Sequence, residues 1–228
     1  YTVTVVDDAA STAADATGSA GSLAATTFGD VRGWVTGGFH RPASGMLISL
    51  AGQSEEGWRQ NADYLLGNGV LRGWRSVGAG RLEGGLYVYG SDWNSPGFVS
   101  VDRYNQGDLE AATDTTDGGD GQRYIGTLRY GLPLGPKTTL DAQLWGQLAQ
   151  STVFLTLPED DVLRQTAERD DREALGFQAL LNRATDDGEF SRGASGRADW
   201  TSYTLDETVQ RESLSAEQAD EGRYQAIG

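Results

Sequence analysis

The sequence contains no cysteine, a single histidine (His40) and a single lysine (Lys137). Without cysteine there can be no disulfide framework, thiolate zinc site, iron–sulfur cluster or cysteine nucleophile. A Ser-His-Asp triad would have to use His40, which lies at the end of an expected strand, and the chain has no Gly-x-Ser-x-Gly elbow. We therefore predict no catalytic residues, no metal ligands and no enzymatic activity.

Basic charge is also scarce. The chain of 228 residues carries 18 Lys plus Arg against 33 Asp plus Glu, a formal net charge of −15. Nucleic-acid binding depends on a basic surface that neutralises phosphates, so nucleic acid is not an expected partner.

Long hydrophobic runs are missing as well. No stretch approaches the roughly 18 apolar residues of a membrane-spanning helix, but a barrel strand needs only about 9–11 residues that alternate apolar with polar. The composition, with 32 Gly, 9 Tyr and 6 Trp, favours sheet over helix.

The pattern of the chain from residue 26 to residue 150 has a period of two. In Arg81–Ser91, for example, Leu82, Leu86 and Val88 share one face, and charged or aromatic side chains share the other. The expected strands are Phe28–Phe39, Met46–Ala51, Tyr64–Trp74, Arg81–Ser91, Arg123–Tyr130, Leu140–Ala149, Ala174–Asn182 and Gly193–Tyr203. A short helix is the alternative for parts of the chain after residue 157, and Glu207–Glu221 is rich in helix formers.

Short and long connections alternate between these strands. Residues 41–45, 75–80 and 132–137 form tight turns, whereas residues 94–122 and 157–173 form long acidic loops. Short turns on one side of a sheet and long loops on the other are typical of outer-membrane barrels, with the turns periplasmic and the loops extracellular.

The apolar face of these strands consists of Gly, Ala, Leu and Val. Such small side chains fill a core poorly but suit contact with lipid, so we expect Leu82, Leu86, Val88, Leu140 and Leu144 to face lipid and the charged face to line a hydrated lumen. A soluble sheet with one solvated face remains the alternative.

Three stretches carry a resemblance to a known family: Gln-Ser-Glu-Glu-Gly-Trp-Arg-Gln-Asn-Ala-Asp-Tyr at 53–64, Ser-Asp-Trp-Asn-Ser-Pro-Gly-Phe at 91–98, and Asp-Gly-Gly-Asp-Gly-Gln-Arg-Tyr-Ile-Gly-Thr-Leu-Arg-Tyr at 117–130. In order and spacing they resemble the N-terminal barrel region of TonB-dependent outer-membrane receptors, and with the strands between them they cover roughly residues 26–183. The family has about 22 strands around a plug. About eight strands can be counted here and no plug sequence is visible, so the chain is expected to be a portion of such a barrel.

The resemblance implies an all-β fold, an antiparallel transmembrane barrel, in residues 26–228. Residues 1–25 are expected to be a flexible lead-in or the tail of a preceding segment. The implied function is uptake across the outer membrane of a Gram-negative bacterium of a scarce, bulky nutrient, such as a siderophore, another metal chelate, a cofactor or an oligosaccharide. The implied partners are outer-membrane lipid and lipopolysaccharide, the ligand, and a TonB-type energy-coupling protein that acts through a plug. The alternatives are a secreted β-rich protein that binds carbohydrate or a partner, a small complete barrel, and an enzyme such as a glycosidase that would use a pair of the many carboxylates.

Candidate ligand-binding residues lie near the loop ends. The aromatic side chains of Trp58 and Trp93 could stack on a ligand or form part of an interfacial girdle, and Arg59 and Asn94 adjoin them. No cofactor is expected. The acidic run at residues 114–121 offers oxygen ligands of the kind that calcium prefers, although a solvated loop is the alternative.

Overall fold

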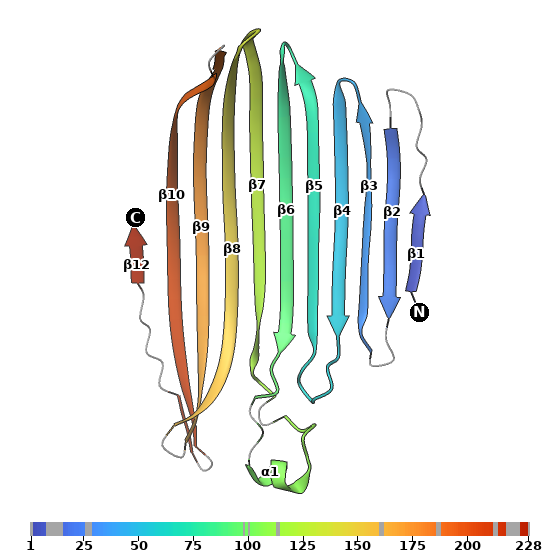
Figure 1. Ribbon diagram of the computed structural model, residues 1–228. Coiled ribbons are helices and arrows are strands. Elements are labelled where there is room, and N and C mark those ends of the chain that lie inside the picture. The colour runs from blue at the N-terminus through green and yellow to red at the C-terminus, as the bar shows by residue number, and fades with distance from the viewer. Residues whose placement is uncertain are drawn as a thin grey trace.

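The computed structural model describes residues 2–7, 16–25, 29–97, 99, 101–112, 115–159, 162–185, 188–211, 214–217 and 224–227. In these residues the chain forms a single antiparallel sheet and one short helix (Figure 1). The elements are β1 (Thr2–Asp7), β2 (Ala16–Ala25), β3 (Val31–Arg41), β4 (Ser44–Glu55), β5 (Tyr64–Val77), β6 (Gly80–Asn94), α1 (Val101–Gln106), β7 (Gly118–Gly135), β8 (Thr138–Glu159), β9 (Val162–Thr185), β10 (Gly188–Arg211), β11 (Leu214–Glu217) and β12 (Tyr224–Ile227).

The spatial order of the strands follows the chain from β1 to β11, and β12 pairs with the free edge of β10. The expected antiparallel all-β fold is therefore confirmed. Within the described residues β1 is not hydrogen-bonded to β10, β11 or β12, so the sheet is open. No described helix is long and apolar enough to cross a membrane.

All eight strands expected from the alternation are present, but the last four are longer than predicted. β8 has 22 residues, and β9 and β10 have 24 each. The expected long loop at residues 157–173 is wrong, because β8 runs to Glu159 and β9 begins at Val162. Residues 16–25 pair along β3 and are part of the sheet, which corrects the expectation of a flexible lead-in.

From β3 to β8 the connections sort by length as the outer-membrane pattern requires. Tight turns join β3 to β4, β5 to β6 and β7 to β8 at one end of the sheet. The β5–β6 turn starts at Gly78, whose φ of 59° is the left-handed conformation that a two-residue hairpin turn needs. At the other end residues 56–63 join β4 to β5, and residues 95–117, which include α1, join β6 to β7. After β8 this sorting ends, because the β8–β9 and β10–β11 connections at this same end are both short.

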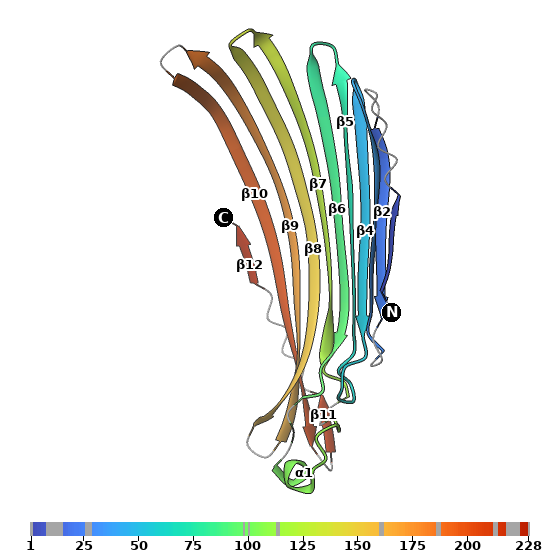
Figure 2. The same cartoon turned by 45° about the vertical axis from the view of Figure 1, so that its right-hand side comes forward.

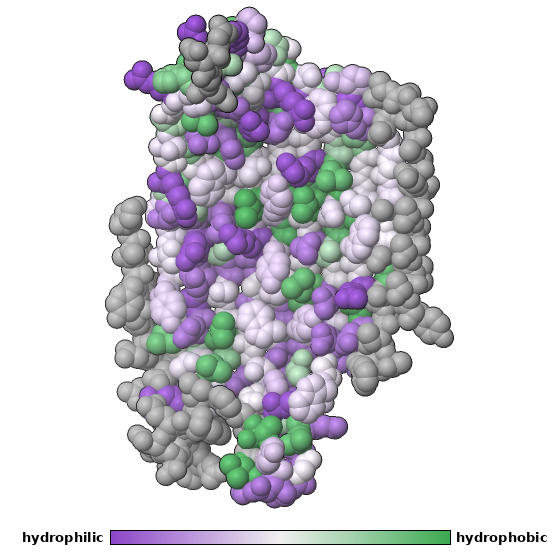
Figure 3. Space-filling view, viewed as in Figure 1, coloured by the Kyte–Doolittle hydropathy of each residue, from purple (hydrophilic) through white to green (hydrophobic). Residues whose placement is uncertain are grey.

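The sheet is curved (Figures 1 and 2). Its two faces differ in polarity, because alternate residues of each strand point to opposite faces. Figure 3 shows the concave face, over which hydrophilic side chains are spread. The register places Arg72, Glu83 and Arg129 on this face. Glu83 pairs directly with Arg129 on β7 and with Trp74 on β5, and Arg72 lies two residues before Trp74 on the same face of β5. Leu82, Leu86, Val88, Leu140 and Leu144 lie on the convex face, so their predicted sharing of one face is confirmed.

The sheet is a single layer. Among the described residues the buried hydrophobic side chains are Ala111, Ala112 and Ala174, which is far too few for a hydrophobic core. The large apolar side chains are instead exposed. Leu144 is 55% exposed, Leu175 59% and Phe177 50%, and all three lie on the convex face. This chain therefore keeps its apolar side chains on an outer surface.

Candidate ligand-binding site

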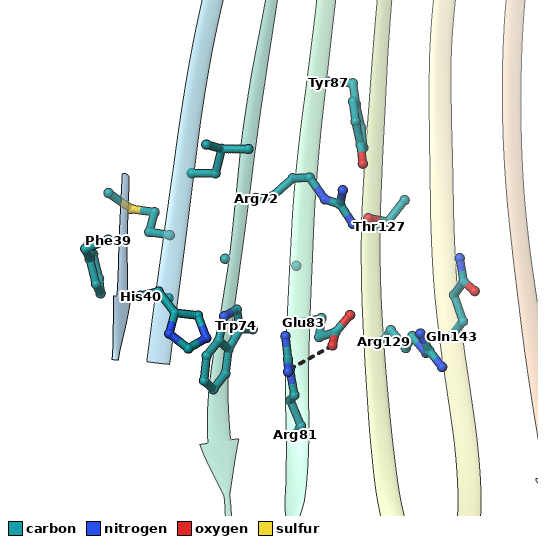
Figure 4. Close-up of a pocket in the computed structure, with 15 residues that line it drawn as sticks. Phe39, His40, Arg72, Trp74, Arg81, Glu83, Tyr87, Thr127, Arg129 and Gln143 are labelled. Carbon is teal, nitrogen blue, oxygen red and sulfur yellow. Dashed lines mark ion pairs between the residues drawn. The ribbon is translucent and has the colours of Figure 1, made fainter. Parts of the chain in front are cut away.

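A hollow of about 520 Å³ lies on the concave face toward the tight-turn end of the sheet (Figure 4). Strands β3 to β8 supply its lining. The residues that characterise it are His40, Arg72, Trp74, Arg81, Glu83, Tyr87, Thr127, Arg129 and Gln143. Strand alternation brings them together, because every second residue of neighbouring strands points to the same face. The result is a polar surface with aromatic and hydroxyl groups between charged ones.

Two of the arginines at the hollow are neutralised by acids. Arg81 lies 2.8 Å from Glu83, and its guanidinium lies 4.0 Å above the Trp74 ring. Arg129 forms a two-pronged contact with Asp141, with its Nη2 donating to Oδ2 at 3.0 Å. Fork-shaped pairing of this kind fixes the direction of both side chains. These pairs are structural features of the wall and leave little charge for a ligand.

Arg72 differs from both. Its side chain is exposed and extends toward Tyr87 and Thr127 (Figure 4). It makes no hydrogen bond, ion pair or ring contact within the described part of the chain. A guanidinium presents five donors and is always charged. Arg72 is therefore the group in the hollow best able to bind an anionic ligand such as a carboxylate.

The residues predicted from the sequence lie elsewhere, at the long-loop end. Arg59 donates from Nη1 to the carbonyl of Gly97 at 3.0 Å, and from Nη2 to those of Ala111 at 3.1 Å and Pro96 at 3.3 Å. Arg59 thus ties residues 56–63 to residues 95–117. Its contacts are with its own chain, which makes it a structural anchor of the loops.

Further contacts complete this connection, which we call the loop knot (residues 56–63 and 95–117). Asn61 has a left-handed φ of 57°, and its Nδ2 donates to the Ser95 carbonyl at 2.8 Å and to that of Asp117 at 3.3 Å. Asn94 Nδ2 bonds both carboxylate oxygens of Asp63 at 3.0 and 3.1 Å. Asn94, predicted as a ligand contact, is also an internal contact of the loops.

The two predicted tryptophans differ in exposure. Trp58 is 69% exposed on the loop knot. The Trp93 ring lies against Gly119, where an added Cβ would come within 2.6 Å of it. Trp58 is thus the predicted residue whose ring is most open to a ligand. The structure gathers the four predicted residues near one end of the sheet but does not bring them to the hollow.

The acidic run at residues 114–121 is described in part. Asp114 lies outside the described residues. Asp117 is 1% exposed, and its Oδ1 accepts from Gln165 at 3.4 Å. Among the described residues no three His, Asp or Glu side chains are grouped so that they could hold a metal ion. Calcium at this run stays a prediction.

Sequence comparison and structure comparison give different results. No family model and no curated protein sequence matches the chain. One solved structure that the fold does match is the ferric citrate transporter FecA in its unliganded form, with a TM-score of 0.64, 13% identity and 91% of this chain covered. The chain spans 32% of the length of that transporter chain. At this identity the likeness shows the fold alone, and that fold is one found in a transporter.

Proposed function

We propose that this chain is the wall of an outer-membrane barrel receptor that binds a small ligand and imports it with energy from a TonB-type complex. The observation that carries the proposal is the apolar band of the convex face. The band consists of every second residue of strands β3 to β9, the ones that point to the convex face. Its limits on these strands are Val31–Phe39 on β3, Met46–Gly52 on β4, Leu65–Gly73 on β5, Leu82–Gly90 on β6, Tyr124–Tyr130 on β7, Leu140–Leu148 on β8 and Leu175–Leu181 on β9.

The height of the band suits a bilayer. It extends over about nine residues on most strands, and a tilted barrel strand needs about 9–11 to cross the hydrocarbon region. No charged residue occurs on the convex face within it. Charged or polar residues follow at both ends: on β9, for example, Glu173 and Arg183 flank the band on the convex face. A surface of this kind is costly in water and favourable in lipid.

The concave face supports a hydrated lumen. Arg81–Glu83, Arg129–Asp141, Arg172–Asp170 and Arg197–Asp199 are all on this face. Their side chains are roughly a third to two thirds exposed except that of Asp141, which is 23% exposed. Charges in such number need water, as in the polar interior of large membrane barrels.

Two likenesses support the proposed ligand and the proposed energy source. Ferric citrate is the cargo named for the matched transporter, and the exposed guanidinium of Arg72 in the hollow supports an anionic chelate of that type as the ligand. The TonB-type partner rests on the sequence resemblance. The loops at the far end, with Trp58 exposed, form the first surface that a ligand from outside would meet.

The proposal is tested in cells that carry or lack the full-length protein. We expect it to stay with the outer membrane after cell breakage and to require detergent for extraction. Iron supplied as labelled ferric citrate should accumulate in the cells that carry it, and a protonophore should abolish the accumulation. Recovery of the protein in the aqueous fraction would refute the membrane assignment. Membrane localisation without energy-dependent uptake would refute the transport of this cargo.

A further inference from the structure

The convex face carries a row of arginines where the apolar band meets the tight turns. We call Arg41, Arg75, Arg183 and Arg192 the basic rim. Arg41 is the last residue of β3, Arg75 and Arg183 lie close to the ends of β5 and β9, and Arg192 lies near the start of β10. The register places each on the same face as the leucines of the band, with Arg192 directly opposite Leu181.

All four side chains of the basic rim are exposed, and none has an acidic partner among the described residues. Arg41 lies 5.3 Å from the centre of the Phe39 ring, and no other contact of a rim guanidinium is found in the described residues. No described Asp or Glu lies on the convex face at this end of the sheet. On the concave face, in contrast, Arg81, Arg129 and Arg197 each have a carboxylate within 3 Å. The rim thus gathers positive charge in a chain whose net charge is −15.

The opposite end of the band has the opposite sign. Beyond it the convex face bears Asp92, Asp120, Asp171 and Glu173. The one described basic residue among them, Arg169, is paired with Asp171 at 3.0 Å. The two borders of one apolar surface therefore face different surroundings. Solubility in water requires charged side chains on the surface, but it does not require positive charge at one border of the band and negative charge at the other.

We propose that the basic rim binds the phosphate groups of anionic phospholipids in the leaflet that surrounds the tight turns. This inference rests on the proposed membrane barrel, because it uses the apolar band to place the rim at headgroup depth. Arginine is suited to this role, since its planar fork donates two parallel hydrogen bonds to a phosphate. Its aliphatic part can lie on the band while the charge reaches the headgroups. The rim is continuous with the lipid-facing surface, so a phospholipid meets both parts at once.

The test compares lipid selection by the full-length protein and by two variants with the same loss of charge. The rim variant carries Arg75→Gln, Arg183→Gln and Arg192→Gln. The matched control carries Arg123→Gln, Arg172→Gln and Arg197→Gln, all on the concave face. Each protein is reconstituted in vesicles that contain phosphatidylethanolamine and phosphatidylglycerol, and the lipids that stay bound are counted by native mass spectrometry.

We expect the unaltered protein and the control to retain phosphatidylglycerol in preference to phosphatidylethanolamine. The rim variant should lose about a factor of five in this preference for each arginine removed, if each contributes as a basic residue near an anionic surface does. Equal loss in both variants would overturn the proposal, because it would show an effect of net charge. Retention of the preference by the rim variant, or its absence from the unaltered protein, would also overturn it.

The outcomes separate this inference from the proposed function. Failure of the unaltered protein to enter these vesicles would refute the membrane barrel itself. Insertion without lipid preference would refute only the basic rim. Far-UV circular dichroism of both variants shows whether the sheet has formed, and a single substitution, Arg75→Gln, supplies the measurement if the triple rim variant does not fold. The single variant should then show the factor for one arginine, and an unchanged preference would count against the proposal.

Discussion

The two faces of the sheet differ in their charged side chains, although they are made by alternate residues of the same strands. Within the apolar band the convex face has no charged side chain, whereas the concave face carries Arg–Asp and Arg–Glu pairs within hydrogen-bond distance. A one-residue shift of register would exchange the faces completely. The contrast teaches that the environment of this protein is specified residue by residue, by parity along each strand.

The strongest way to break the contrast is to place a charge in the middle of the band. Leu144 is 55% exposed on the convex face of β8, and Gln143 precedes it on the concave face. Leu144→Arg should destabilise the membrane-inserted protein by about 2–4 kcal/mol, the cost of an arginine facing lipid near the midplane. Urea unfolding of the full-length protein in lipid vesicles measures this change.

The matched control is Gln143→Arg on the neighbouring residue. Because its side chain points into the hollow, the free energy of unfolding should change by less than about 1 kcal/mol, the usual size of an exposed polar change. Equal effects of the two substitutions would mean that the two faces meet the same surroundings, and the assignment of the convex face alone to lipid would fail.

The loop knot offers a second, smaller comparison between Arg59, which holds the two loops together, and Trp58, which is exposed to solvent. Arg59→Ala removes three hydrogen bonds to carbonyls, and charged hydrogen bonds contribute about 1.5–3 kcal/mol each when geometry is good. We expect the local opening free energy of residues 56–63 and 95–117 to fall by about 2 kcal/mol, with cleavage by a protease in these loops about 30-fold faster.

Trp58→Ala is the control for the loop knot. Since Trp58 is 69% exposed, its removal should leave the protease sensitivity of the loops unchanged. If it instead weakens the binding of ferric citrate, the sequence-based prediction of Trp58 as a ligand contact is supported. Faster cleavage of the Trp58→Ala loops would show that the ring packs on the knot.

Much of the sheet could be predicted from the sequence, because the band imposes a strict period of two. On β8 one face is apolar or small and the other mostly polar, a period of two and not the 3.6 of a helix: Leu140, Ala142, Leu144, Gly146 and Leu148 alternate with Asp141, Gln143, Trp145, Gln147 and Ala149. The signal disappears beyond the apolar band, where both faces of a strand carry polar side chains. In β9 residues 164–173 carry charge on both faces, so their sequence resembles a loop although they pair fully with β8.

The prediction for the residues before the first expected strand was wrong for a different reason. Residues 16–25 are Ala, Gly, Ser and Thr with a single Leu, and such small residues mark neither face of a strand. Their place in the sheet comes from pairing with β3, a contact between segments that local sequence does not encode.

The site was predictable in composition but not in role. Arg72, Arg81 and Arg129 could be assigned to the wet face by parity alone. The difference between a paired arginine and Arg72 depends on which strand lies opposite and in which register, and that is known only from the fold. Arg59 was predicted as a ligand contact because its position in a loop is visible in the sequence, whereas the carbonyls that it bonds are distant in the chain.

A third prediction separates the paired from the unpaired arginines of the hollow. Arg72→Gln should weaken binding of ferric citrate to the full-length protein about tenfold, since one charge-assisted contact of about 1.4 kcal/mol would be lost. Stability in vesicles should not change, because Arg72 bonds no other described residue. Calorimetric titration measures the affinity. Unchanged affinity would remove Arg72 from the ligand site.

The smallest effect is expected for the ion pairs of the concave face. Arg129 and Asp141 are 52% and 23% exposed in their side chains, so water screens the pair and its net contribution should be about 0.2–1 kcal/mol. A double-mutant cycle of Arg129→Gln and Asp141→Asn, measured by unfolding in vesicles, isolates this coupling energy. The coupling should shrink further between low salt and about 1 M salt, where the screening length falls to about 3 Å. A coupling above about 3 kcal/mol that salt does not alter would mean that the pair is shielded from water. The concave face would then be as dry as the convex one, and the difference between the two faces would be one of residue type alone.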